Sequence, residues 1–122
     1  MFEIRRYRRQ SGTEPITEWL TDLADRQAQA RILARIERLE VGNFGDSKFL
    51  RDGVSELRID WGPGYRVYYG RDGGSIILLL CGGDKRKQSP DIEKAIKLWR
   101  EYLTEKARNP AAIRQPYRIG KN

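Results

Sequence analysis

The residues best suited to chemistry in this 122-residue chain are cationic, because it has no histidine to serve as an acid, a base or a metal ligand. Arg58 lies within Val54–Ile59, where apolar and polar side chains alternate. The same alternation surrounds Arg66 in Tyr65–Tyr69 and predicts two β-strands, which the turn residues Trp61–Gly64 join as a hairpin. If the strands pair in register, both arginines lie on one sheet face, where guanidinium groups are able to bind phosphate.

A third strand is predicted over the continuous apolar run Ile76–Cys81, after a second glycine-rich turn at Arg71–Gly74. The two hairpins form an antiparallel meander. The cations Lys85, Arg86 and Lys87 follow the third strand and add positive charge at the end of the sheet.

Two helices are predicted before the meander. Pro15 suits the first turn of the first helix, and the second helix is expected from after Asp25 to about Val41. Apolar residues at helical spacing define their buried faces: Ile16, Trp19, Leu20 and Leu23, then Ala28, Ile32, Ile36 and Leu39. A neighbouring stripe of Arg31, Arg35 and Arg38 is interpreted as a solvated face or a contact for an acidic partner, with direct RNA contact as the alternative.

Alternation over Phe2–Arg8 predicts a first strand at a sheet edge. Asn43–Asp52 is predicted to be a surface loop, in which Lys48 and Arg51 could reach a ligand. Trp61, at the hairpin turn, is expected to pack against the sheet rather than to stack on RNA.

A final helix is predicted with Ser89 as its N-cap and Pro90 at its first position, ending near Leu103. The predicted order is therefore β-α-α-β-β-β-α, an α+β fold with helices packed on one face of an antiparallel meander sheet. The opposite face is expected to remain partly open and to carry Arg58, Arg66 and Tyr68. Residues 1–103 form one domain, and residues 104–122 are predicted to be a flexible basic tail.

Composition narrows the class of protein. Lys and Arg number 24 against 17 Asp and Glu, and the resulting net charge of +7 favours an anionic partner. The only cysteine, Cys81, excludes an internal disulfide and a cysteine metal cluster, and its place in an apolar strand predicts a structural thiol. No apolar stretch reaches 18 residues, so we expect a cytoplasmic protein that does not cross a membrane.

The meander also resembles the RelE/ParE toxin superfamily, and within it the HigB-like addiction-module killer proteins. The matching segments are Gly53–Arg58, Gly62–Tyr68 and Leu79–Gln88, with weaker similarity over Trp19–Asp46. The resemblance covers roughly residues 2 to 103. It implies the same small RelE-like α+β fold and no metal or other cofactor.

Ribosome-dependent members of this superfamily cut messenger RNA with arginines and lysines on the sheet. By motif match, the resemblance places the catalytic cations at Arg66, Arg58 and Lys85. We expect Arg66 to be the main phosphate clamp, Arg58 to support it, and Lys85 to stabilise the transition state or leaving group. The RNA backbone would be contacted by the other nearby side chains Lys48, Arg51, Tyr68, Arg86 and Lys87, with simple packing as the alternative for Tyr68.

The sequence offers two candidates for the acid–base group and does not decide between them. Glu56 is a candidate base on the face of Arg58, although an ion pair with that arginine or with Arg66 is the favoured interpretation. Asp91 is a second candidate, with the alternative of stabilising the N-terminus of the last helix. Several relatives carry tyrosine or histidine near this point, whereas Gln88–Asp91 contains neither.

The resemblance implies the toxin of a type II toxin–antitoxin pair, acting as a ribosome-dependent endoribonuclease. Its partners would be the ribosome, messenger RNA and a HigA-like helix-turn-helix antitoxin in a hetero-oligomer. The alternatives are a ParE-type toxin that inhibits DNA gyrase by protein binding, and a non-catalytic antitoxin-binding module.

Overall fold

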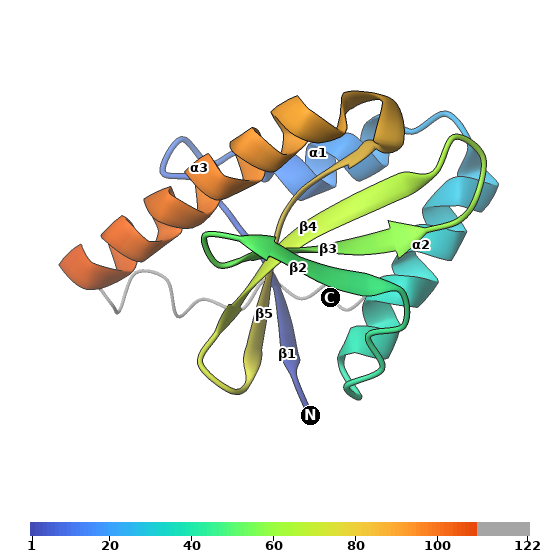
Figure 1. Cartoon of the computed structure of the whole chain (residues 1–122). Helices are drawn as coiled ribbons and strands as arrows, with labels where there is room; N and C mark the ends of the chain where they lie inside the picture. Colours follow the sequence, from blue (N-terminus) through green and yellow to red (C-terminus); the bar gives the residue numbers. More distant parts are fainter. Residues whose placement is uncertain (110–122) are drawn as a thin grey trace.

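The computed structural model describes residues 1–109 and shows a five-stranded sheet between helices (Figure 1). The elements are, in order, β1 (Glu3–Arg6), α1 (Pro15–Asp22), α2 (Arg26–Leu39), β2 (Ser47–Arg51), β3 (Val54–Ile59), β4 (Tyr65–Asp72), β5 (Ile76–Asp84), the 3₁₀ turn η1 (Lys85–Lys87) and α3 (Gln88–Arg108). The predicted α+β class is confirmed. Among residues 1–109, no helix is long and apolar enough to cross a membrane.

The strands lie in the order β1-β5-β4-β3-β2, so β1 is at an edge as predicted. β1 pairs with β5 in parallel, and the other neighbours are antiparallel. The meander of β3, β4 and β5 is confirmed, and Arg58 lies directly opposite Arg66 in its register.

β2 corrects the prediction that Asn43–Asp52 is a loop, because Ser47–Arg51 pairs with β3 as the opposite edge strand. This strand has no alternating apolar pattern, and Phe49 is exposed. Hydrogen bonds hold it instead: the Ser47 hydroxyl donates to the Glu56 carbonyl at 3.1 Å and lies 2.6 Å from the Tyr69 hydroxyl. Such pairing depends on the position of β3, so hydrophobic periodicity does not reveal it.

α1 and α2 cover one face of the sheet, as predicted. Ile16 and Leu20 of α1, with the predicted α2 stripe of Ala28, Ile32, Ile36 and Leu39, join one hydrophobic cluster. Leu57, Val67 and Leu79 meet them from three neighbouring strands. The period of two in the strands and of about 3.6 in the helices therefore brings these side chains into one core.

α3 packs on the opposite face, which corrects the prediction that helices lie on one face only (Figure 1). Its residues Ile96 and Trp99 join a second cluster with Tyr68 and Leu80. A β-carbon on Gly70 would lie 2.4 Å from the Trp99 ring, so the missing side chain at Gly70 is what lets the indole rest on β4. α3 therefore covers a large part of the face on which Arg58 and Arg66 lie.

Both ends of α3 differ from the prediction. The helix begins at Gln88 after Lys87, so Ser89 is not its N-cap and Pro90 is its third residue. Pro remains compatible there, because N–H groups of a first turn have no partner within the helix. The preceding turn η1 is capped instead, as Asp84 accepts a hydrogen bond from the backbone of Arg86.

At its other end α3 continues to Arg108, five residues beyond the predicted domain limit. Tertiary contacts explain the extension. Tyr102 and Lys106 both bind Asp72 of β4, and the Tyr7 hydroxyl donates to Glu105 at 2.8 Å. The rest of the predicted tail, residues 110–122, lies outside the described residues.

Candidate functional site

The candidate site lies where β3 and β4 meet their connecting turn. Arg58 and Arg66 project from adjacent strands on the α3 side of the sheet, as the alternation predicts. Their side chains are 33% and 14% exposed, respectively. Both guanidinium groups are therefore anchored in the protein while part of each still reaches solvent.

A buried carboxylate holds these two arginines. Glu56 is 1% exposed, and its Oε2 accepts a hydrogen bond from Arg58 Nε at 3.0 Å. Its Oε1 lies 3.6 Å from Arg66 Nε and accepts a hydrogen bond from Gln88 Nε2 at 3.0 Å. A carboxylate enclosed in this way has no access to a substrate hydroxyl. The ion-pair interpretation of Glu56 is thus supported, and the geometry argues against its use as a general base.

Arg66 and Lys85 approach each other across Gly64. A β-carbon on Gly64 would lie 3.6 Å from Arg66 Nη1 and 3.5 Å from Lys85 Cδ. The Lys85 backbone amide also donates to the Gly64 carbonyl at 2.9 Å, which fixes the start of η1 beside the β3–β4 turn. Lys85 is exposed and makes no ion pair within residues 1–109.

We call Arg58, Arg66 and Lys85 the site cations. They come from β3, β4 and η1, and the fold gathers them at one end of the sheet. Arg66 Nε is buried and makes no hydrogen bond to the described residues, although it lies close enough to Glu56 for an ion pair. Three cations held together in this way suit an anion with several oxygens, such as a phosphodiester.

Asp91 is the second predicted acid–base candidate. It lies in the first turn of α3, and a β-carbon on Gly83 would lie 1.9 Å from its Oδ2. Gly83 pairs with Arg66, so this carboxyl sits over the strand next to Arg66. Burial raises the pKa of Asp91 above its ordinary value. Burial thus favours the protonated form of this carboxyl relative to an exposed aspartate, which makes Asp91 the better placed proton donor of the two candidates.

Tyr68 does not fit the predicted stacking role. Its ring is fully buried in the cluster beneath α3, so it packs and offers no face to a base. Its hydroxyl is buried and finds no hydrogen-bond partner in the part of the chain that the structure describes. Burial, with the negative charges of Glu56 and Asp91, raises the pKa of Tyr68 well above its ordinary value.

The two predicted contacts of β2 differ. Lys48 pairs with Glu56 in the strand register and is exposed, with no ion pair in residues 1–109. Arg51 pairs with Val54 at the far end of β3 and forms ion pairs with Asp52 and Glu93. Lys48 therefore lies nearer to the site cations, whereas Arg51 is away from them.

The two cations after Lys85 are both exposed. Arg86 binds Asp84 through two hydrogen bonds, from Nε to Oδ1 at 3.2 Å and from Nη2 to Oδ2 at 2.8 Å. Lys87 makes no ion pair within residues 1–109 and immediately precedes α3. Arg86 therefore already has an anionic partner, and Lys87 is the freer of the two.

Sequence reasoning does not identify three groups that support the site. Gln88 bonds Glu56, Asp46 Oδ1 lies 3.5 Å from Arg58 Nη1, and Arg35 Nη1 donates to the Arg58 carbonyl at 2.7 Å. Each contact joins residues distant in sequence, and no local pattern marks it. The Arg35 contact also gives one member of the predicted arginine stripe a structural role.

Two other predictions concern residues around the site. Trp61 packs against the first core cluster as expected, and its ring lies under the Arg31 guanidinium at 3.8 Å. Cys81 is a buried thiol, and burial raises its pKa to about 12, which agrees with a structural role. Within residues 1–109, no group of three or more His, Cys, Asp or Glu residues is arranged to hold a metal ion.

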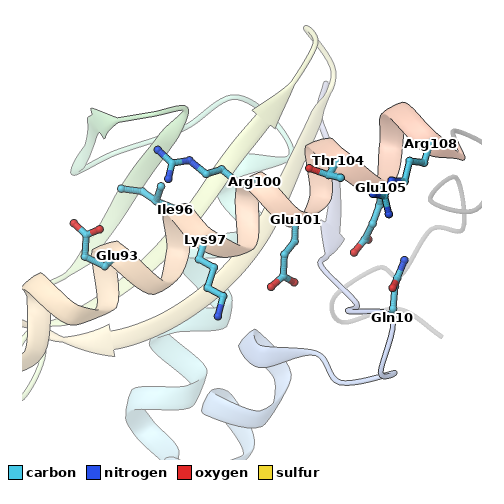
Figure 2. Close-up of a pocket in the computed structure, with 9 residues that line it drawn as sticks. All are labelled: Gln10, Glu93, Ile96, Lys97, Arg100, Glu101, Thr104, Glu105 and Arg108. Atoms are coloured by element: carbon cyan, nitrogen blue, oxygen red, sulfur yellow. The ribbon is translucent and has the colours of Figure 1, made fainter.

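A separate cavity of about 480 Å³ lies along the outer face of α3, opposite Gln10 (Figure 2). It contains none of the site cations. Among residues 1–109 its charged lining residues balance, three acidic and three basic: Glu93, Glu101 and Glu105, with Lys97, Arg100 and Arg108. This balance gives no preference for an anion, so the end of the sheet remains the candidate functional site.

Comparison with known proteins agrees with this fold. Residues 18–100 match the family described as phage derived protein Gp49-like (DUF891). An uncharacterized protein of Haemophilus influenzae Rd is 53% identical over 83 residues, which cover 68% of this chain and 84% of the relative. The matched region contains all three site cations, Glu56 and Asp91. The chain therefore belongs to the Gp49-like family, which falls broadly within the RelE/ParE-like toxin fold.

Proposed function

We propose that this protein is the toxin of a type II toxin–antitoxin pair and cleaves messenger RNA on the ribosome, as the HigB-like branch does. The observation that carries the proposal is the gathering of Arg58, Arg66 and Lys85 around one open end of the sheet, with Glu56 buried between the arginines. An arrangement that preorganises cations toward solvent suits a developing negative charge.

The proposed reaction is attack of a ribose 2′-oxygen on the adjacent phosphorus. The O2′–P bond forms while the P–O5′ bond breaks, giving a 2′,3′-cyclic phosphate and a free 5′-hydroxyl. Arg66 binds the phosphoryl oxygens as their charge grows, and Arg58 supports the same charge from β3. Lys85, whose side chain lies next to Gly64, stabilises the leaving oxygen.

Proton transfer is assigned to Asp91. Its protonated form donates to the departing 5′-oxygen, and water takes the proton of the 2′-hydroxyl. Asp91 is favoured over Glu56 because it makes no ion pair within residues 1–109 and burial raises its pKa, whereas Glu56 is enclosed by two arginines and Gln88. Lys48 and Lys87 extend the positive surface for the RNA backbone, with smaller contributions from Arg86 and Arg51.

Primer extension on a reporter messenger in a translating extract tests this function. Wild-type protein is compared with Arg66→Ala and with Arg100→Ala, a matched control in which an exposed arginine of α3 is removed. We expect cuts at a fixed codon phase only during translation, retained in Arg100→Ala and lost in Arg66→Ala. Cuts that persist in a folded Arg66→Ala protein would refute the site assignment.

Two observations favour the gyrase-inhibiting alternative. Gln88–Asp91 contains neither tyrosine nor histidine, and Glu56 is not accessible as a base. If the messenger stays intact while expression induces DNA damage, the ParE-type function replaces the nuclease. If expression causes neither effect, the protein is a non-catalytic binding module. In each case we expect an antitoxin partner, of the HigA-like helix-turn-helix kind for the nuclease.

A further inference from the structure

A second basic region lies on the other side of the sheet. A concave surface of about 620 Å³ follows α2 where this helix meets the end of β3. We call it the α2 groove. Its α2 lining consists of residues three or four positions apart, which form one helical face: Gln27, Ala30, Arg31, Ala34, Arg35 and Arg38.

The floor of the α2 groove is small and apolar. Ala30 and Ala34 are exposed and lie one turn apart, and Ile59 borders them from β3. Alanines on a helix surface let the backbone of a second helix approach closely. From residue 27 to residue 38 the groove is about 16 Å long at the helical rise of about 1.5 Å per residue, enough for about three turns of a docked helix.

Fixed positive charge lies around this floor. Arg31 rests on the Trp61 ring, and Arg35 donates to the carbonyls of Arg58 and Phe44 at 2.7 and 3.2 Å. Arg38 is exposed and makes no ion pair within residues 1–109. Against these three arginines the groove presents one carboxylate, Asp60. The surface is thus complementary to an acidic ligand.

The observations favour an acidic protein segment over RNA. Within residues 1–109, the lining of the groove contains no aromatic residue on which a base could stack, and Arg31 already covers the face of Trp61. Arg35 directs its guanidinium at two backbone carbonyls, so its fork is not free for a phosphate. A second copy of the chain is disfavoured because each copy carries a net charge of +7.

We propose that the α2 groove binds an acidic amphipathic helix of a partner protein, with small apolar residues against Ala30 and Ala34 and carboxylates beside Arg31 and Arg38. The inference rests on the proposed function only for the identity of that partner, the antitoxin. The groove is on the α1–α2 side of the sheet and the site cations are on the α3 side. The helix would therefore dock without touching the site cations.

Chemical-shift mapping on the ¹⁵N-labelled full chain tests this proposal. The probe is a capped 15-residue helical peptide with glutamates along one stripe and alanine and leucine along the adjacent stripe. Its control has glutamine at every glutamate position. We expect shifts confined to residues 27–38 and 59–60, with the control peptide binding about tenfold more weakly, since several exposed ion pairs are lost.

A pair of protein variants sharpens the test. Arg38→Glu should weaken binding of the acidic peptide about tenfold, whereas Arg100→Glu, the same charge change on exposed α3, should weaken it less than twofold. Equal effects of the two variants would show that only net charge matters and would overturn the proposal.

Four other results would also overturn the proposal. They are no shift at millimolar peptide, shifts centred on Arg58, Arg66 and Lys85, displacement of the peptide from the groove by an RNA oligonucleotide, and the same shifts on raising the protein concentration alone. None of these measurements uses RNA cleavage. Failure of the primer-extension test would therefore leave the groove proposal standing, and a failed peptide titration would leave the nuclease proposal standing.

Discussion

The two basic regions of this molecule contain similar residues in different surroundings. Arg58 and Arg66 point along a sheet face and share the buried carboxylate of Glu56. In the α2 groove, Arg31 and Arg35 are held by an aromatic ring and by backbone carbonyls, around a floor of alanines. Arginine charge alone therefore does not define a phosphate site. The side chains that hold the guanidinium groups decide where their free N–H groups point and what shape of anion they accept.

The largest effect should come from a substitution among the site cations that keeps their charge. Arg66→Lys preserves the cation but removes the planar fork, so we expect RNA cleavage to fall about a hundredfold or more. Initial cleavage rates in the translating extract measure this loss. The matched change Arg38→Lys in the α2 groove should alter the rate less than twofold. Similar losses in the two variants would remove the distinction between the regions.

Glu56→Gln tests the buried carboxylate that holds Arg58 and Arg66. Loss of its charge-assisted bonds to Arg58 and Gln88 should lower the free energy of unfolding by about 2 kcal/mol. Urea denaturation measures this change. Glu37→Gln, on the exposed side of α2, is the control and should change the free energy by less than about 0.5 kcal/mol. An unchanged midpoint for both variants would show that Glu56 does not stabilise the arginine pair.

Gly83→Ala should separate activity from folding. The new methyl group would meet Asp91 Oδ2, the end of a side chain that can rotate away, so the fold should persist while the carboxyl moves. We expect cleavage to fall about tenfold or more, in line with the usual contribution of a displaced acid. Gly74→Ala is the control, because its β-carbon meets nothing within 4 Å. Wild-type rates in a folded Gly83→Ala protein would exclude Asp91 as the acid.

The stability of the protein should also depend on pH through Asp91. Its folded-state pKa is raised by burial, so between its ordinary value of 3.8 and the raised value the folded state binds more protons than the unfolded state. The contribution of Asp91 to stability is therefore complete below pH 3.8 and is lost as the pH rises through the folded pKa. Unfolding free energies of wild type and Asp91→Asn, compared across this range, should diverge with increasing pH. A constant difference would contradict the raised pKa.

The smallest effect concerns the α2 groove. Arg31→Ala removes a guanidinium that lies 3.8 Å from the Trp61 ring, and an exposed contact of this kind contributes about 0.5 kcal/mol. Thermal unfolding should show a shift of only a few degrees, with cleavage unchanged. Arg26→Ala, at the exposed start of the same helix, provides the control. A large loss of cleavage in Arg31→Ala would place this groove in the RNA site.

Local pattern accounts for much of the fold and for part of the site. Alternation in Val54–Ile59 and Tyr65–Tyr69 is sufficient to place Arg58 and Arg66 on one face, and helical spacing identifies the α2 stripe. The same patterns do not locate β2, which depends on backbone pairing with β3. They also do not decide whether Tyr68 is buried or exposed, because α3 is the element that buries it on that face.

Residue order thus establishes the elements, the faces of the strands and the excess of positive charge, because these follow from short-range periodicity and composition. Only the tertiary structure brings Gln88 to Glu56, Lys85 to Gly64 and Arg35 to the carbonyl of Arg58. These contacts join residues 21 to 32 positions apart, and each depends on how a helix or turn packs against the sheet. For that reason the sequence predicts which residues are cationic, and the packing decides which of those cations act together.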